Sequence, residues 1–306
     1  MKTSTLKIAA PNGPALHTHR WLPEGDPRAT LLIVHGMAEH GGRYARFAKL
    51  LTDAGIAVYA LDLPGHGRTS SPTDLGHFAN RNGWSVALGA IHAVHSSIAE
   101  RDGKRPLFIL GHSMGSFLVQ HYLVEHGNKL DGAILSATNG DLGLLRAIGL
   151  ALIRAEALIF GRRHRSALAE AMTFKEFNKK FKPNRTEFDW LSRDDAEVDK
   201  YIADPLCGFR CTTGLWIDLL KASARLTDIA RLSRIPKTLP VLLIAGSVDP
   251  ASNGATGPKV LEQAYRAAGL KDVTVSIYDG ARHELLNETC RNAVMEELSE
   301  WIGAHL

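Results

Sequence analysis

The chain has 306 residues, of which 45% are hydrophobic and 22% are charged, and its formal net charge is +4. This length accommodates one large domain with an insertion, or two modest domains. The composition is that of a globular protein and argues against disorder. The small, dispersed positive charge argues against a nucleic-acid partner, because phosphate binding needs a concentrated basic surface.

The cysteines, Cys207, Cys211 and Cys290, are sparse and odd in number. This usage fits a reducing compartment better than a disulfide framework. The N-terminus has no apolar stretch long enough for a signal peptide, and no segment reaches the roughly 18 uncharged apolar residues that a membrane span needs. We therefore expect a cytoplasmic protein that is at most peripheral to a membrane.

Short apolar runs alternate with segments of helical periodicity along most of the chain. A hairpin of strands over 5–9 and 15–22 comes first. Continuous apolar runs are typical of strands buried on both faces. They predict strands over 31–34, 56–61, 107–110, 133–135, 241–244 and 273–277, separated by helices over 43–54, 84–100, 114–127, 215–232, 256–268 and 289–304. The alternation predicts an α/β fold: a mostly parallel eight-stranded sheet flanked by helices, with ligands at the carboxyl ends of the strands.

The alternation is interrupted over residues 139–215, where the sequence is helical and charged. We interpret this segment as an inserted helical domain. Residues 1–138 and 216–306 would then form the core that contains the sheet.

The segment Gly111-His112-Ser113-Met114-Gly115 follows an apolar run and precedes a helical pattern. In a strand-turn-helix of this spacing the serine takes a strained conformation, and side chains at the two glycine positions would collide with neighbouring elements. The hydroxyl of Ser113 then projects outward, which makes this serine a candidate nucleophile.

A serine hydroxyl needs a base, usually a histidine that a carboxylate orients. In a sheet of this kind the acid and then the histidine follow the serine along the chain. The histidines after Ser113 are His121, His126, His164, His283 and His305. Only His283 lies in a loop directly after a predicted strand, so we assign it as the base.

The acid should also follow a strand and precede His283. Asp249, in Gly246-Ser247-Val248-Asp249-Pro250, meets both conditions. Asp279 is the competing candidate, but it is too close in sequence to His283 to approach the ring from the opposite side. An Asp-Pro pair is also common in turns, so the pair alone is no evidence for a catalytic acid. Asp249 is favoured only because the neighbouring sequence supports the same assignment.

Attack on a carbonyl creates an oxyanion that needs preorganised donors. The backbone N–H of Met114, at the start of a helix, is one candidate. The second is the backbone N–H of Met37, in the loop after the predicted strand over 31–34. Packing and loop hydrogen bonds are the expected roles of three histidines at the same edge: His35, His66 and His112.

Other chemistries find little support in the sequence. His92 and His95 are three residues apart on a predicted helix, without a third metal ligand. Cys207 and Cys211 lack a second pair of ligands for zinc. We therefore expect neither a metal nor a cofactor.

Four motifs lie at the predicted strand ends: His35-Gly36-Met37-Ala38-Glu39-His40-Gly41-Gly42-Arg43-Tyr44, Asp62-x-x-Gly65-His66-Gly67-x-x-Ser70, Gly111-His112-Ser113-Met114-Gly115 and Gly246-x-x-Asp249-Pro250. With them the chain resembles the α/β-hydrolase superfamily over nearly its whole length, and within it the monoacylglycerol lipase and lysophospholipase group. The resemblance implies a serine esterase or lipase acting on single-chain acyl glycerols, lysophospholipids or simple esters. It also implies that the insertion is a cap over the acyl pocket.

Residues 142–160 of the insertion are apolar apart from Arg146, Arg154 and Glu156, and basic residues follow them. A helix of this kind could touch a membrane surface transiently and admit lipid. Alternatively, it packs over the acyl pocket with its basic neighbours in solvent, which we favour. The two interpretations are compatible.

The sequence therefore predicts an ester hydrolase that forms an acyl-enzyme on Ser113, with a small acyl ester or lipid as its substrate. A broad-specificity carboxylesterase for short or medium acyl chains is the alternative. A non-catalytic binding protein of the same fold is a more distant alternative. The oligomeric state cannot be inferred from the sequence.

Overall fold

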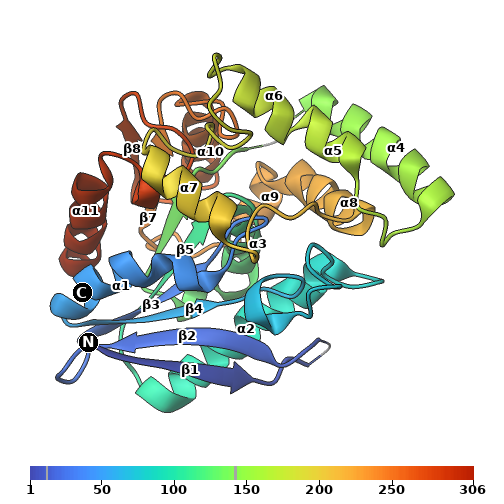
Figure 1. Cartoon of the computed structure of the whole chain (residues 1–306). Coiled ribbons are helices and arrows are strands. Elements are labelled where there is room, and N and C mark those ends of the chain that lie inside the picture. Colours follow the sequence, from blue (N-terminus) through green and yellow to red (C-terminus); the bar gives the residue numbers. More distant parts are fainter. Residues whose placement is uncertain (12, 141–142) are drawn as a thin grey trace.

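The computed structural model describes residues 1–11, 13–140 and 143–306, so Leu142 of the predicted apolar segment lies outside the described residues. One eight-stranded sheet spans the molecule in the order β1-β2-β4-β3-β5-β6-β7-β8 (Figure 1). Its strands are β1 (Lys2–Ile8), β2 (Leu16–Leu22), β3 (Ala29–Val34), β4 (Ile56–Leu61), β5 (Leu107–His112), β6 (Gly132–Ser136), β7 (Val241–Gly246) and β8 (Val273–Tyr278). Strand β2 is antiparallel to β1 and β4, and the other pairs are parallel. The predicted fold is confirmed.

Helices cover both faces of the sheet. Helices α1 (Ala45–Asp53) and α11 (Arg291–Ala304) pack on one face. Helices α2 (Gly83–Asp102), α3 (Met114–His126) and α10 (Thr256–Ala267) pack on the other. Strands β3 to β7 are buried along their whole length, which explains their continuous apolar sequences.

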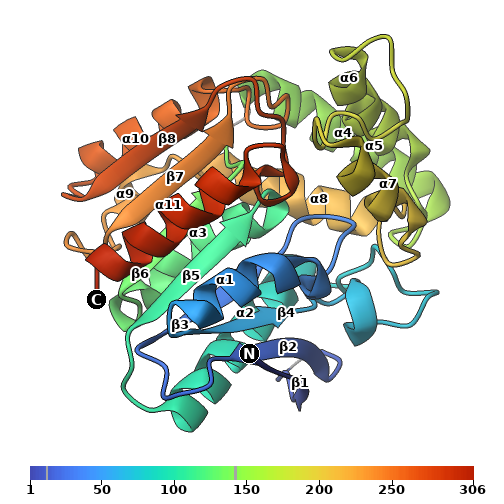
Figure 2. The same ribbon diagram turned by 60° about the vertical axis from the view of Figure 1, so that its left-hand side comes forward.

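The chain between β6 and β7 contains α4 (Gly143–Phe160), α5 (Ala167–Met172), α6 (Phe174–Lys179), α7 (Asp195–Ala203), α8 (Thr213–Ala222) and α9 (Ile229–Leu232). Figures 1 and 2 show α4 to α7 gathered above the sheet. The prediction of one helix over 215–232 was wrong: the chain leaves α8 through a 3-10 turn, and the Asp228 side chain caps the separate helix α9. The expected boundary between residues 215 and 216 falls inside α8.

None of the helices within the described residues is long and apolar enough to cross a membrane.

Candidate active site

Ser113 lies in the tight turn between β5 and α3, with φ 51° and ψ −120°. A β-carbon at Gly115 would lie 2.2 Å from the carbonyl oxygen of Val34, and one at Gly111 would lie 2.6 Å from that of Gly115. Only glycine fits at these two positions, which lets β5, α3 and β3 approach closely enough to hold the strained serine. The Ser113 amide donates to the carbonyl of Ser136 at 2.9 Å, so β6 also fixes the turn.

The structure brings Asp249 and His283 together from the loops after β7 and β8. The Nδ1 atom of His283 lies 3.0 Å from each carboxylate oxygen of Asp249. With Nδ1 held by the carboxylate, Nε2 is the nitrogen that remains for proton transfer. No hydrogen bond joins Ser113 and His283 among the described contacts, but both residues line the same cavity.

Two neighbours hold the Asp249 carboxylate in place. The Ala251 amide donates to Oδ1 at 2.9 Å, and the Ser252 hydroxyl donates to Oδ2 at 2.7 Å. Burial would raise the pKa of Asp249, but His283, Ser252 and Ala251 outweigh it and lower the pKa. The competing Asp279 is exposed and accepts from the Ser247 hydroxyl instead. Sequence reasoning missed Ser252, although the turn after Asp249 was a signal for such a contact.

His283 is buried between aromatic rings. Its ring centroid lies 4.7 Å from that of Trp190, in the insertion, and 4.9 Å from that of His112. Burial disfavours the imidazolium, but the charge and hydrogen bond of Asp249, together with the charges of Glu284 and Glu39, outweigh burial and raise the pKa of His283. Burial lowers the pKa of His112 to about 4, so this second ring is neutral at neutral pH.

The loop after β3, which carries Met37, is fixed from the insertion. Ala38 has φ 55°, a strained value for a residue with a side chain. Its carbonyl oxygen accepts from the Tyr201 hydroxyl and the Gly208 amide, both at 2.9 Å. Met37 lines the cavity that contains Ser113, and Met114 is the first residue of α3, where amides have no intrahelical partner.

A buried ion network connects this loop to the histidine loop. The Arg43 guanidinium binds Glu39 at 2.9 Å and pairs with both carboxylate oxygens of Glu284 at 2.7 Å. Glu39 also accepts from the Gly36 amide at 2.6 Å and from the Tyr44 hydroxyl at 3.1 Å. Glu284 follows His283 directly, so Arg43 ties the two halves of the site together. Sequence reasoning missed the pairing of Arg43 with Glu284, because the two residues are far apart along the chain.

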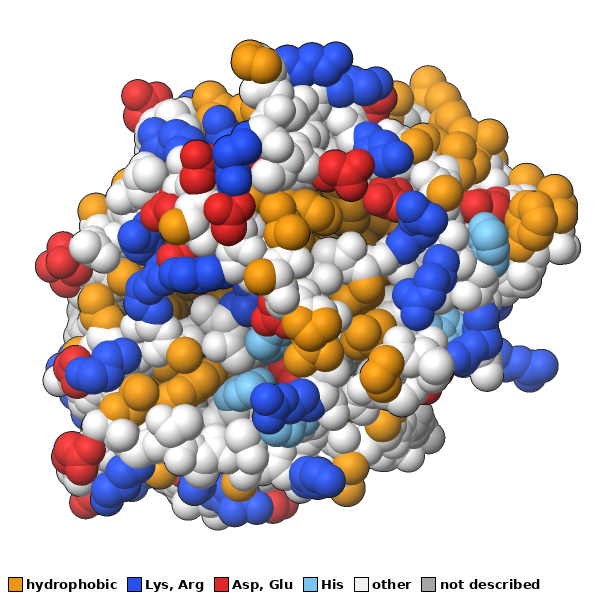
Figure 3. All heavy atoms as spheres, viewed as in Figure 1, with side chains coloured by type: hydrophobic (Ala, Val, Ile, Leu, Met, Phe, Trp, Pro, Cys, Tyr) orange, Lys and Arg blue, Asp and Glu red, His pale blue; other side chains and the backbone are white. Residues whose placement is uncertain are grey.

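The cavity at Ser113 has a volume of about 50 Å³. Its inner wall is aromatic and its outer part is charged, with Glu170, Lys175, Glu187 and Arg210 among its lining residues. Figure 3 shows a hollow with hydrophobic walls and a charged rim near α6 and α7. Such a site can enclose an ester next to a polar group.

A second, larger cavity of about 670 Å³ lies under α4. It is lined mainly by apolar groups, including Gly149, Ile153 and Ala251. Trp216 of α8 lines both cavities, so the two spaces are neighbours.

The histidines expected to serve in packing do so. Nδ1 of His35 lies 2.7 Å from the Gly36 carbonyl oxygen, and its Nε2 accepts from the Leu63 amide at 3.0 Å. Nδ1 of His66 lies 3.0 Å from the Pro64 carbonyl oxygen, and burial lowers the pKa of His66 to about 3. These bonds confirm that both rings brace loops at the edge of the sheet.

A sequence profile of the family described as serine aminopeptidase, S33, matches residues 25–290. The chain belongs to this family. This S33 hydrolase is 29% identical over 300 residues to the monoacylglycerol lipase of Mycolicibacterium smegmatis. The aligned region covers 94% of this chain and 92% of the relative. It is also 29% identical to the human monoglyceride lipase, over 95% of this chain and 88% of the relative.

Solved structures share the fold of this S33 hydrolase. A thermostable carboxyl esterase from Bacillus coagulans in complex with glycerol superposes with a TM-score of 0.89 at 24% identity, covering 99% of each chain. A lipase in an open form superposes with a TM-score of 0.88 at 26% identity, again over 99% of each chain.

Proposed function

We propose that this S33 hydrolase cleaves carboxylic esters of single-chain lipids, such as monoacylglycerols or lysophospholipids. The observation that carries this proposal is that the strained Ser113 shares a cavity with His283, whose ring is held by the buried Asp249. Similarity to bacterial and human monoglyceride lipases over nearly the whole chain supports the substrate class.

The proposed reaction has two steps, and both use the same residues. His283 removes the Ser113 proton as the hydroxyl attacks the ester carbonyl, while Asp249 fixes the histidine tautomer. The Met37 and Met114 amides stabilise the oxyanion. His283 then protonates the leaving alcohol, which leaves an acyl-enzyme, and a water activated by His283 releases the fatty acid.

The larger cavity under α4 is the proposed site of the acyl chain. Its apolar lining suits an alkyl chain, and Trp216 places it next to the cavity of Ser113. The charged outer part of the smaller cavity suits the polar alcohol half of the ester. In this proposal residues 139–215 form a cap domain on a core of 1–138 and 216–306.

Helix α4 is also a proposed contact with a membrane surface. Its exposed side chains include Leu144, Leu145, Leu158, Ile159 and Phe160, with exposed fractions of 61–89%. Figure 3 shows hydrophobic side chains along this edge of the molecule, with basic ones nearby. An apolar helix face beside cations is typical of interfacial helices.

An acyl-length and head-group series tests the substrate class. We expect kcat/KM to rise from acetyl to medium or long acyl chains, on p-nitrophenyl esters and on monoacylglycerols, with Ser113→Ala as the blank. Parallel assays with lysophosphatidylcholine distinguish the two lipid head groups. A preference for acetyl and butyryl esters would identify a short-chain carboxylesterase instead. Activity confined to aminoacyl p-nitroanilides would overturn the proposal.

A further inference from the structure

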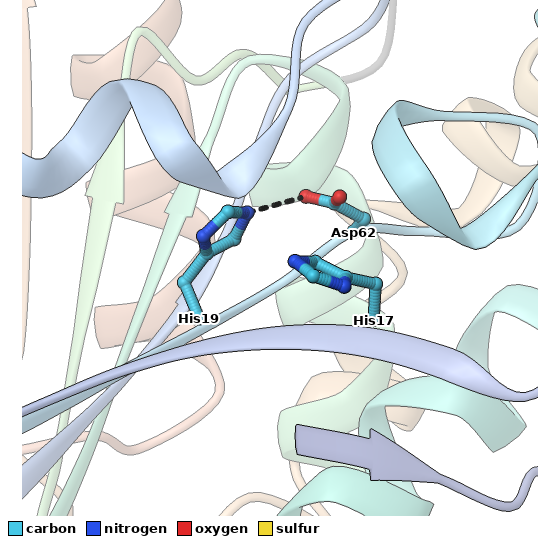
Figure 4. A group of neighbouring side chains, drawn as sticks. All are labelled: His17, His19 and Asp62. Carbon is cyan, nitrogen blue, oxygen red and sulfur yellow. Dashed lines mark ion pairs between the residues drawn. The ribbon is translucent and has the colours of Figure 1, made fainter. Parts of the chain in front are cut away.

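A cluster of two histidines and one aspartate lies outside both cavities described above. His17 and His19 are two residues apart on β2, so their side chains lie on the same face of the strand. Because β2 pairs with β4, the register brings them beside Asp62, the first residue after β4. Figure 4 shows the three side chains pointing toward one another.

The donor atoms of these side chains lie close together but make few hydrogen bonds. One ligand atom from each residue lies within 4.8 Å of the other two. Nε2 of His19 lies 3.5 Å from Oδ1 of Asp62. The Nε2 atoms of both histidines are buried and have no hydrogen-bond partner among the described residues. Two buried ring nitrogens without hydrogen-bond partners, beside one carboxylate, are unusual because such nitrogens lower the stability of a folded protein.

We propose that His17, His19 and Asp62 bind a divalent transition-metal ion of the zinc class. Two imidazoles and one carboxylate suit Zn²⁺ or Co²⁺, whereas Mg²⁺ and Ca²⁺ prefer oxygen ligands. In a tetrahedral site the donors lie about 2.1 Å from Zn²⁺ and so about 3.4 Å apart. Nε2 of His19 and Oδ1 of Asp62, 3.5 Å apart, already match this spacing. The remaining donors lie within 4.8 Å and need to close by at most about 1.4 Å.

The surroundings of the cluster favour this assignment. The Asp62 carboxylate is held by the amides of Gly41, at 2.8 Å, and Arg68, at 2.7 Å. Such hydrogen bonds orient a ligating carboxylate. The His19 side chain is 15% exposed, which gives an ion a path from solvent.

A neighbouring cluster, His40, Asp204 and Cys207, is a weaker candidate. His40 and Asp204 already bind each other at 2.9 Å, so neither lacks a partner. Burial raises the pKa of the Cys207 thiol, which disfavours the thiolate that a metal needs.

Zinc titration of tag-free, chelator-treated protein by calorimetry tests the proposal. We expect one Zn²⁺ per chain, with affinity reduced at least about tenfold in His17→Gln and in His19→Gln. The control His126→Gln, which removes a histidine elsewhere, should bind as the wild type does. Zn²⁺ should also raise the Tm of the wild type and of the control, but not of the two variants, because the ion binds only the folded chain.

X-ray absorption of the zinc-loaded wild-type protein makes the test independent of how the variants fold. We expect two imidazole ligands and no sulfur. A sulfur ligand would place the ion at a cysteine and overturn the proposal. Absence of stoichiometric binding to the wild type, or unchanged binding by folded His17→Gln and His19→Gln, would also overturn it.

Discussion

His283 is the residue through which every proton of the proposed reaction passes. Its Nδ1 atom is held by Asp249, and the rings of Trp190 and His112 enclose it. A histidine in this setting must be neutral to act as a base. Since Asp249 stabilises the imidazolium, deprotonation requires a higher pH than for a histidine in water.

The first prediction concerns pH. Because the pKa of His283 is raised, kcat/KM should rise with pH through a midpoint above the ordinary histidine value of about 6.5. Stopped-flow or steady-state assays across the pH range check this. In Asp249→Asn, kcat should fall on the order of 10³- to 10⁴-fold. A profile with an acidic optimum in the wild type would contradict the role of His283.

The position of a residue relative to a strand end decided what sequence reasoning could find. Asp249 and His283 follow buried apolar strands, so their proximity was predictable from topology. The contact of Ser252 with Asp249 and the pairing of Arg43 with Glu284 depend on how loops fold. His17 is a third case, because the pairing of β2 with β4 brings it to Asp62 and the sequence did not indicate that pairing.

At the scale of elements, the site is assembled from several loops, each of which is held by a different strand or helix. Arg43, just before α1, binds the loop after β3 through Glu39 and the loop after β8 through Glu284. Burial would raise the pKa of Glu39, but Arg43 and the other groups around the carboxylate together outweigh burial and lower this pKa to about 2. A buried pair of this kind is costly to break, because one charge stays behind without a partner.

The second prediction follows from this network. Arg43→Met leaves Glu39 and Glu284 buried without their cation, so the free energy of unfolding should fall by about 3 kcal/mol, and kcat should fall with it. Urea denaturation and kinetics measure the two effects. Lys49→Met removes an exposed pair with Asp53 in α1 and should change stability by less than about 0.5 kcal/mol. Equal stability of the two variants would show that the network contributes nothing.

The third prediction concerns the cavity under α4. A β-carbon at Gly149 would meet Leu220 and Met172 at ordinary contact distances of 3.8 and 3.9 Å. Gly149→Ala should therefore leave the acyl-length profile unchanged. Gly149→Leu places a larger side chain in the cavity, so it should lower kcat/KM for oleoyl esters and spare butyryl esters. If both chain lengths respond equally, the acyl chain binds elsewhere.

Strands and insertion helices differed in how well their sequences predicted them. Strand β4 is buried on both faces, so its apolar run matched its observed bounds, Ile56–Leu61. Helices α5 and α6 have six residues each, too few for a periodic pattern to define, and tertiary packing sets their ends. The break after α8 was missed because the apolar pattern continues through it.

At the scale of the whole molecule, helices α4 to α7 stand above the sheet, with α4 at their edge (Figures 1 and 2). The inner side of α4 buries Leu150 and Ile153 against the core. Its outer side leaves Leu158 89% exposed and Ile159 74% exposed. The outer side is the part that a lipid surface would cover.

The fourth prediction tests that surface. Leu158→Ser with Ile159→Ser should reduce co-sedimentation with anionic phospholipid vesicles several-fold, while hydrolysis of a soluble butyryl ester stays unchanged. The control Ile229→Ser changes an exposed apolar residue in α9 and should bind vesicles as the wild type does. Failure of the wild type to bind vesicles would contradict the proposed membrane contact.

The central claim is that Ser113 forms the acyl-enzyme. Mass spectrometry of the folded protein after treatment with a fluorophosphonate tests it most directly. We expect one adduct per chain, on the peptide containing Ser113, with loss of esterase activity in proportion to labelling. Ser113→Ala should be unlabelled and inactive. An active, folded protein without an adduct on Ser113, or a Ser113→Ala variant that keeps its activity, would contradict the claim.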